Sequence, residues 1–204
     1  MINTKNLTTK EVIIETTELL LQEKGNVTIK EIAEAAFVNV AAINYHFGNK
    51  DNLMKIVIEN VVSRLQNNII KTLNNPRINE LSFEDVMNKI IEVVFDFAQK
   101  NTGIFNYSFL QVASDSLTTN VLVNFFLTNE DYTAIVYKHL NNVFPEASEE
   151  ELFTKHMILF SSFIVPLFLS FNLQLNKSPD HKLVNLFNDF KTNYIGEIKR
   201  WLLP

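Results

Sequence analysis

The sequence predicts an all-α protein. Apolar residues recur at helical spacing along almost the whole chain, and helix-capping residues precede most of these stretches. Only four glycines and five prolines are present, which leaves little material for strands and tight turns. We expect about nine helices from this pattern, divided into a three-helix head in residues 1–50 and a helical body in residues 51–204.

The most informative helix is predicted to begin after Thr28. The Thr28 hydroxyl can accept a hydrogen bond from the backbone N–H of Glu31, and the Glu31 carboxylate can reach back to Thr28, which together form a capping box. One face of this helix collects the residues that we expect to pack inside the head: Ile29, Ile32, Ala33 and Ala36.

A second short helix is predicted after a tight turn in which Val38 fills the gap. Asn39 is a favourable N-cap, Ile43 and Phe47 form the buried side, and Gly48 can end the helix in a left-handed conformation. Two short helices joined by such a turn form a helix-turn-helix. This motif is a device for placing one helix in the major groove of DNA.

Caps, apolar spacing and prolines predict the remaining helices. We expect them at about residues 49–74, 82–100, 101–113, 118–143, 148–176 and 178–203. Gly103 is expected to interrupt the third of these, and Ser148 is expected to form a capping box with Glu151. Ser178 followed by Pro179 is expected to start the last one.

The residues at the end of the second short helix indicate which kind of helix-turn-helix protein this is. The run AAINYHFGNKDNL at residues 41–53 resembles the DNA-binding signature of the TetR family of transcriptional regulators. The resemblance covers about residues 8–60 and implies a DNA-binding head, a ligand cavity in the body and a dimer. The family usually has glycine in the turn, where Phe37 stands in this chain. A positive φ at this position would strain a phenylalanine.

Charge gives a mixed indication for DNA binding. Residues 1–55 carry six lysines, no arginine and seven acidic residues, and the whole chain has a formal net charge of −5, which argues mildly against nucleic acid. However, Lys10, Lys30 and Lys50 each fall in the first turn of a predicted helix, after Thr8, Thr28 and Asn49 as the expected caps. Cations oppose the helix dipole there unless a phosphate binds at the same place. We therefore interpret the three lysines as a clamp on the DNA backbone.

Roles in DNA binding follow as hypotheses. Apolar contacts to base edges are expected from the start of the recognition helix, at Val40, Ala41 and Ala42. Asn44 is expected to contact a base edge or a phosphate, and Thr28 and Lys50 to fix the register on the backbone. The resemblance implies that Tyr45 and His46 bind phosphates. The alternative for these two residues is that they pack on the first helix or on the helix that follows.

The body is rich in aromatic residues, which most often form ordinary core. The specific possibility is a cavity for an apolar or aromatic small molecule between helices, as the resemblance also implies. The candidate ligand-binding residues are Phe95, Gln99, Phe105, Phe109, Phe126, Tyr132 and Phe163. Gln99 and Tyr132 are the expected polar anchors of this group.

The last two helices predict a homodimer. Residues 157–171 are apolar nearly all round, which requires burial on every side, and the segment is too short and too interrupted by Ser161, Ser162 and Pro166 to span a bilayer. Two copies of the last helix pair would form a four-helix bundle. The expected interface residues are Leu159, Phe168, Phe187, Phe190, Tyr194 and Trp201. A two-fold dimer would bind an inverted-repeat operator.

Signatures of catalysis and metal binding are absent from the sequence. There is no glycine-rich phosphate loop, no Gly-x-Ser-x-Gly elbow and no metal-ligand spacing among the four histidines, and there are no cysteines. No secretory signal is expected, and we expect the protein in the cytoplasm. His139 and His156, on apolar helices, are interpreted as hydrogen-bonded structural residues.

The sequence therefore predicts a ligand-responsive transcriptional regulator without cofactor, metal or membrane association. We expect a repressor that binds double-stranded operator DNA as a homodimer and that a small apolar or aromatic effector releases. Two alternatives stay open from the sequence. One is an all-α ligand-binding or enzymatic protein whose helix-turn-helix is vestigial. The other is a DNA-binding regulator controlled by a protein partner.

Overall fold

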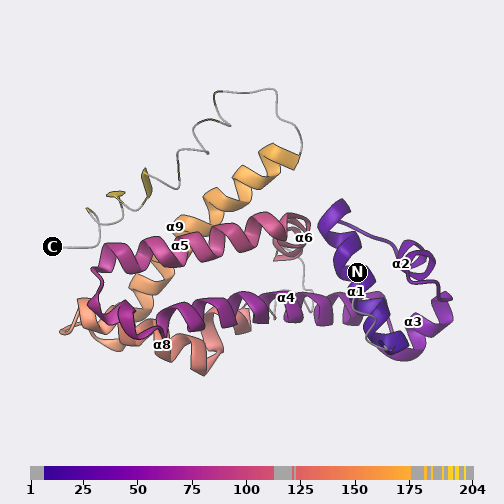
Figure 1. The fold of residues 1–204 in the computed structure, drawn as a ribbon, viewed down its shortest axis with the longest axis horizontal. Helices are drawn as coiled ribbons and strands as arrows, with labels where there is room; N and C mark the ends of the chain where they lie inside the picture. Colours follow the sequence, from indigo (N-terminus) through magenta and orange to yellow (C-terminus); the bar gives the residue numbers. More distant parts are fainter. Residues whose placement is uncertain are drawn as a thin grey trace. The chain divides into compact units, whose positions relative to one another are not determined.

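The computed structural model describes residues 7–112, 121 and 123–175, together with residues 182, 185, 190, 193, 194, 196, 197 and 200. Most of these residues are helical, and there is no strand among them (Figure 1). The first four helices are α1 (Thr9–Lys24), α2 (Ile29–Ala35), α3 (Val40–Phe47) and α4 (Lys50–Leu73). A 3-10 turn, η1 (Pro76–Glu80), precedes α5 (Phe83–Lys100) and α6 (Thr102–Val112). They are followed by a π-helical turn, η2 (Asn124–Thr128), and by α8 (Glu130–Val143) and α9 (Glu149–Leu175).

The chain divides into two compact units. The head unit comprises Met1–Arg64 and Lys100–Asn124, and the body unit comprises Leu65–Gln99 and Phe125–Pro204. Besides residues 1–50, the head unit includes the first part of α4 and the whole of α6. Within the described residues, no helix is long and apolar enough to cross a membrane.

Local caps start the helices where the sequence predicted. Thr8 caps α1 and Thr28 caps α2, each through a complete capping box. The Asn39 side chain accepts from the backbone N–H of Ala42 at 2.7 Å and so caps α3. At α9, Ser148 N–H donates to the Glu151 carboxylate at 2.8 Å. These starts are confirmed because a cap depends only on residues within one helical turn.

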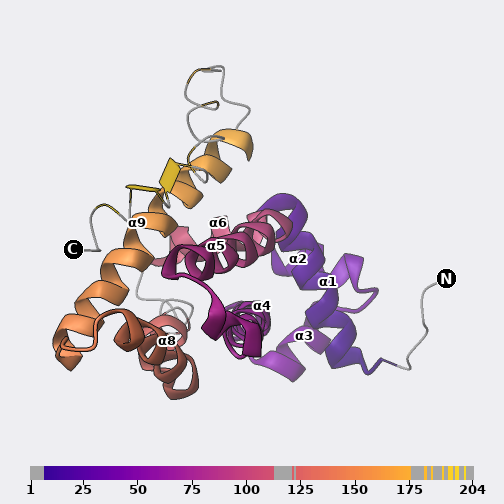
Figure 2. The ribbon, with the colours of Figure 1, turned by 60° about the vertical axis from the view of Figure 1, so that its left-hand side comes forward.

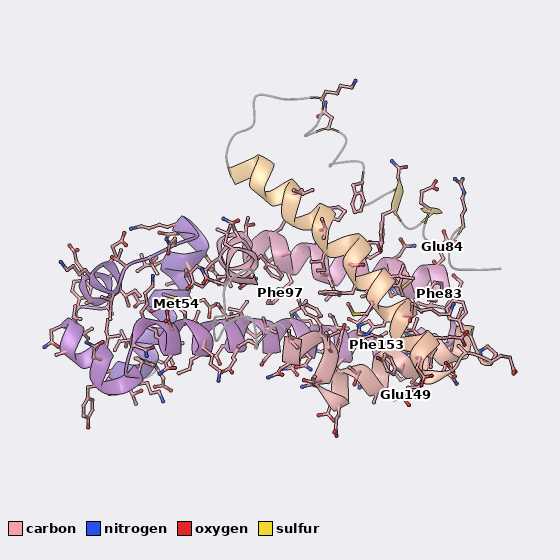
Figure 3. All side chains as sticks on the ribbon, turned by 180° about the vertical axis from the view of Figure 1, so that it is seen from behind. Met54, Phe83, Glu84, Phe97, Glu149 and Phe153 are labelled. Carbon is pink, nitrogen blue, oxygen red and sulfur yellow. The ribbon has the colours of Figure 1, made fainter. Side chains whose placement is uncertain are left out.

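The head unit has its own apolar core, built where α1, α2, α3 and the start of α4 meet. Met54, labelled in Figure 3, is one of the fully buried side chains on α4. The buried residues that α1, α2, α3 and α4 contribute to this unit include Ile13, Leu21, Ile32, Ala33, Ile43, Phe47, Leu53 and Met54. Ile43 and Phe47 are thus core residues, as their spacing predicted.

Gly103 does not interrupt a helix, contrary to the prediction. It lies inside α6, which is continuous from Thr102 to Val112. A Cβ at this position would lie 2.0 Å from the Leu21 carbonyl oxygen of α1. The glycine therefore serves a close crossing of α6 over α1. The Gln22 side chain donates to Asn101 Oδ1 at 3.0 Å beside this crossing.

The helix expected over residues 118–143 is divided. The π-helical turn η2 ends at Thr128, and Asn129 then caps α8 by accepting from the backbone N–H of Tyr132 at 2.9 Å. Residues 113–120 lie outside the described part. The expected start of the last helix, at Ser178 and Pro179, also lies outside the described residues, whereas residues such as Lys182 and Tyr194 are helical.

The body unit combines the end of α4 with α5, α8 and α9 (Figure 2). Its helices α8 and α9 are consecutive and pack on one another. Tyr194, from the last segment, is buried and binds back to α9, with its hydroxyl 2.6 Å from Ser162 Oγ and donating to the Leu159 carbonyl at 3.1 Å. These helices enclose the cavity described below.

Candidate nucleic-acid interface and effector cavity

Helix α3 presents a polar and aromatic face to solvent. Ala41 and Asn44 are exposed, and 86% of Tyr45 is exposed. The alternative that Tyr45 packs on α1 or α4 is therefore excluded. His46 is partly buried, because its ring lies between the rings of Tyr45, at 5.2 Å between centroids, and Phe47, at 6.1 Å. Val40 and Ala42, the other residues expected to reach base edges, are half-buried.

The turn before α3 carries the strain that the sequence suggested. Phe37 has a φ of 55°, and no other non-glycine residue in the described part has a positive φ. Its side chain is 94% exposed, so packing does not compensate for the conformation. After α3, Gly48 has φ 79° and ψ −55°, which lies outside the left-handed helical region that we expected for it.

Three lysines lie at the starts of helices in the head unit. Lys10, Lys30 and Lys50 occupy the first turns of α1, α2 and α4. In the described part of the chain, none of them forms an ion pair with a carboxylate, although Lys10 Nζ lies 6.0 Å from the centroid of the Phe47 ring. Lys24, at the end of α1, differs because its ammonium group is 2.8 Å from Glu31 Oε1.

The capping box at the start of α2 occupies both donors of Thr28. Glu31 Oε2 accepts from both the backbone N–H and the hydroxyl of Thr28, each at 2.8 Å. Hydrogen bonds from Lys24 and then from Thr28 lower the pKa of Glu31 to about 2. The donors of Thr28 are therefore committed within the protein, which bears on the phosphate contact expected of this residue.

The body unit contains one well-formed cavity of about 510 Å³ among its described residues. This volume falls within the range of small-molecule sites, about 300–1,000 Å³. Residues from the end of α4, from η1 and from α5 form part of the wall: Ile69, Leu73, Ile78, Leu81, Phe83, Val86, Met87, Ile90, Ile91 and Val94. The rest of the wall comes from η2, α8, α9 and the last segment: Phe126, Tyr132, Val136, His139, Leu140, Asn142, Val143, His156, Leu159, Phe160, Ile164 and Tyr194.

Two of the seven candidate ligand-binding residues, Phe126 and Tyr132, lie on this wall. Phe95 and Gln99 belong to α5 but are not among the described lining residues, and Gln99 is exposed. Phe105 belongs to α6 in the head unit and is not among the described lining residues. The side chains of Phe109 and Phe163 lie outside the described part.

The polar groups of the cavity wall differ in their environment. Burial raises the pKa of Tyr132 to about 12, so this phenol stays neutral. Burial also lowers the pKa of His156, whose side chain is only 4% exposed and whose Nδ1 has no hydrogen-bond partner. The sequence interpreted His156 as a hydrogen-bonded structural residue, and this interpretation is wrong for Nδ1. A histidine on an apolar helix carries no sequence signal that distinguishes the two cases.

The expected dimer-interface residues of α9 and the last segment do not share one environment. Leu159 and Tyr194 line the cavity, and Tyr194 is buried within one chain, so it is not available to a second copy. Phe190 stacks on Tyr194 at 5.2 Å between centroids. The side chains of Phe168, Phe187 and Trp201 lie outside the described part.

Helix α9 nevertheless has an exposed apolar stripe. Ile158, Val165 and Leu169 are each about half exposed, and their spacings of seven and four residues place them on one side of the helix. The cavity residues His156, Phe160 and Ile164 lie on the opposite side. Among the described residues, no cluster of histidine, aspartate and glutamate is arranged to hold a metal ion.

Comparisons with known proteins agree with this architecture. Residues 13–57 match the model of the bacterial regulatory proteins of the tetR family. The chain is 30% identical over 131 residues to the probable HTH-type transcriptional regulator YttP of Bacillus subtilis, an alignment that covers 62% of this chain and 61% of that protein. The chain thus matches less than two thirds of the length of this relative.

Solved structures share the fold over nearly the whole chain. Salmonella enterica GusR superposes with a TM-score of 0.65 at 14% identity, covering 98% of both chains. The fatty acid degradation regulator FadR from Bacillus halodurans gives a TM-score of 0.63 at 15% identity, covering 91% of this chain and 97% of that one. The head of this chain therefore matches the DNA-binding domain of the TetR family of transcriptional regulators, and the whole chain shares the fold of these solved structures.

Proposed function

We propose that this protein is a homodimeric repressor that binds an inverted-repeat operator and is released by a small molecule in the body cavity. The observation that carries the proposal is the head unit, where the exposed Tyr45 of α3 accompanies three lysines at helix starts that form no ion pair within the described part of the chain. The regulator acts as a binding protein and not as an enzyme.

The lysine positions support contacts to the DNA backbone. A lysine in the first turn of a helix opposes the helix dipole at a cost of about 0.3–1 kcal/mol. A phosphate at the same place reverses this effect, because the free backbone N–H groups and the ammonium group then act together. Lys10, Lys30 and Lys50 each have this arrangement, and Lys30 and Lys50 begin the helices on either side of α3.

The exposed face of α3 supports contacts to the duplex itself. Tyr45 and His46 are proposed to bind phosphates, and Val40, Ala41 and Ala42 to touch base edges through apolar contacts. Asn44 is exposed and can donate to either. The donors of Thr28 already serve Glu31, so we propose that Thr28 orders the start of α2 and that Lys30 makes the phosphate contact there.

Release by an effector is proposed to act through α4. This helix begins at Lys50, directly after α3, and its later residues Ile69 and Leu73 line the cavity. A molecule that binds better to one position of these residues shifts the population toward that conformer. We propose that the ligand-bound conformer holds the two recognition helices of the dimer at a separation that does not fit the operator.

The second copy of the chain is proposed to bind on the exposed stripe of α9. Ile158, Val165 and Leu169 present apolar surface on one side of this helix. Pairing two such helices around a two-fold axis buries both stripes at once. Replacing Val165 and Leu169 by aspartate should give a monomer in analytical ultracentrifugation. A dimer that survives both changes would place the interface elsewhere.

DNA binding is tested with duplexes from the region upstream of the protein's own gene, by fluorescence anisotropy at several salt concentrations. In a dimer, Lys50→Gln removes two phosphate contacts and should flatten the slope of log K against log salt by about 1.8. Lys89→Gln, at an exposed position of α5, is the matched control and should leave the slope unchanged. Failure of the protein to bind any of these duplexes, or equal slopes in the two variants, would refute the proposal.

A further inference from the structure

The buried polar groups of the cavity wall are not equally available to a ligand. The Tyr194 hydroxyl is already bound to Ser162 and to the Leu159 carbonyl. His156 is as deeply buried, but its Nδ1 has no hydrogen-bond partner. Leaving a buried polar group without a partner costs about 1–3 kcal/mol. His156 also lines the cavity, so a polar ligand group that reached its Nδ1, an atom shielded from solvent in the unbound protein, would supply the missing hydrogen-bond partner.

Two tyrosines of α8 surround the imidazole. The ring of Tyr132 lies 6.1 Å from that of His156, and the ring of Tyr137 lies 5.8 Å away in an edge-on arrangement, measured between centroids. Burial also lowers the pKa of His156, so the ring is neutral near pH 7 and presents one donor and one acceptor.

The charge of the wall limits the class of ligand. Among the described residues that line the cavity, none is an aspartate, glutamate, lysine or arginine. Burying a carboxylate or an ammonium group without a partner is far more costly than burying a hydroxyl that has one. An ionised effector would lose its hydration in this cavity and gain no opposite charge.

We propose that the cavity takes a neutral, largely apolar effector with a hydroxyl or carbonyl group, and that the His156 imidazole recognises that group by a hydrogen bond. Only the regulatory effect of this ligand rests on the proposed function. Binding of the ligand to the cavity is measurable without DNA. This proposal assigns the polar specificity of the site to His156, whereas the sequence nominated Gln99 and Tyr132 as the polar anchors.

The test compares matched ligands on the full-length protein near neutral pH, by isothermal titration calorimetry. The aromatic set is β-naphthol, naphthalene, β-naphthoate and β-naphthylmethylammonium, and the aliphatic set is decanol, decanoate and decylammonium. In at least one set the hydroxyl compound should bind with measurable affinity, and more tightly than its ionised analogues. β-Naphthol should bind about tenfold more tightly than naphthalene, the gain of one good hydrogen bond.

Variants separate recognition from packing. His156→Leu should abolish the preference for β-naphthol over naphthalene, while His156→Asn or His156→Gln, which restore a polar atom near one ring nitrogen, should recover part of it. His139→Leu is the matched control, because this histidine also lines the cavity but is only half-buried, and it should keep the preference. Circular dichroism melting curves establish that each variant is folded.

Three results would overturn the inference. They are equal or tighter binding of the ionised analogues, a preference that persists in His156→Leu, and failure of every compound to bind the wild-type protein. DNA binding is measured separately. Loss of DNA binding with an intact hydroxyl preference would refute the proposed regulator and leave the ligand class standing. Normal DNA binding with no hydroxyl preference would refute the ligand class and leave the proposed regulator standing.

Discussion

Replacing Gly103 by alanine should destabilise the head unit, although alanine is the better helix former. The added Cβ would lie 2.0 Å from the Leu21 carbonyl oxygen and 2.7 Å from that of Gln22. A relaxed contact between carbon and a carbonyl oxygen is about 3.3–3.6 Å. Both obstacles are backbone atoms of α1, which cannot rotate away, so α6 and α1 must separate by more than about 1 Å for that contact to form.

The magnitude follows from three contributions. Overpacking a close contact costs about 1–3 kcal/mol. Separating the helices also strains the hydrogen bond between Gln22 and Asn101, which measures 3.0 Å and contributes about 1 kcal/mol. Against these, alanine gains about 0.5–1 kcal/mol over glycine within a helix. The net loss is therefore about 1–3 kcal/mol of unfolding free energy, from the same contributions.

Urea unfolding followed by circular dichroism measures this loss as a lower midpoint. Gly196→Ala is the matched control, because the same change at that helical position meets no atom within 4 Å and should stabilise the protein slightly. If Gly103→Ala leaves the midpoint unchanged or raises it, the reasoning about the crossing of α6 and α1 is refuted.

Three further changes test the head unit. Phe37→Gly should raise the unfolding free energy by about 0.5–1 kcal/mol, because glycine adopts the φ of 55° without strain and the lost side chain is exposed. A lower melting temperature in this variant would contradict the claim that Phe37 is strained. Asn39→Ala should lower the unfolding free energy by about 1 kcal/mol, since it removes the 2.7 Å bond to Ala42 N–H, and an unchanged urea midpoint would contradict this role. Glu31 has a folded pKa of about 2 against 4.5 when unpaired, so its contribution to stability is complete above pH 4.5 and is lost as pH falls toward 2. The Glu31→Gln variant lacks this contribution, so the difference in unfolding free energy between wild type and variant should shrink as pH falls from 4.5 toward 2. A difference that stays constant over this pH range would refute the assignment.

Local interactions made the helix starts predictable. Thr28 and Asn39 act on backbone groups three residues away, so the sequence alone contains both partners of each cap. The sequence also indicated that a positive φ would strain Phe37, which stands where the family usually has glycine, and its φ is 55°. Such features need no knowledge of the tertiary fold.

Long-range packing accounts for what the sequence did not predict. Gly103 was expected to break a helix, because its role depends on carbonyl groups about eighty residues earlier in the chain. Phe105 was nominated for the cavity on aromatic character alone, whereas the fold assigns it to the head unit. The unpaired Nδ1 of His156 is a property of its neighbours on α8, which no pattern on α9 reveals.

Helix α9 has a different function on each of two opposite sides. His156, Phe160 and Ile164 form cavity wall on one side, while Ile158, Val165 and Leu169 offer apolar surface on the other. If two copies pair on this surface as we propose, one helix contributes to both sites, and filling the pocket and pairing two chains are then thermodynamically linked. Dilution of the protein should then change how tightly an effector is held, so titrations at nanomolar and micromolar protein need not give the same dissociation constant.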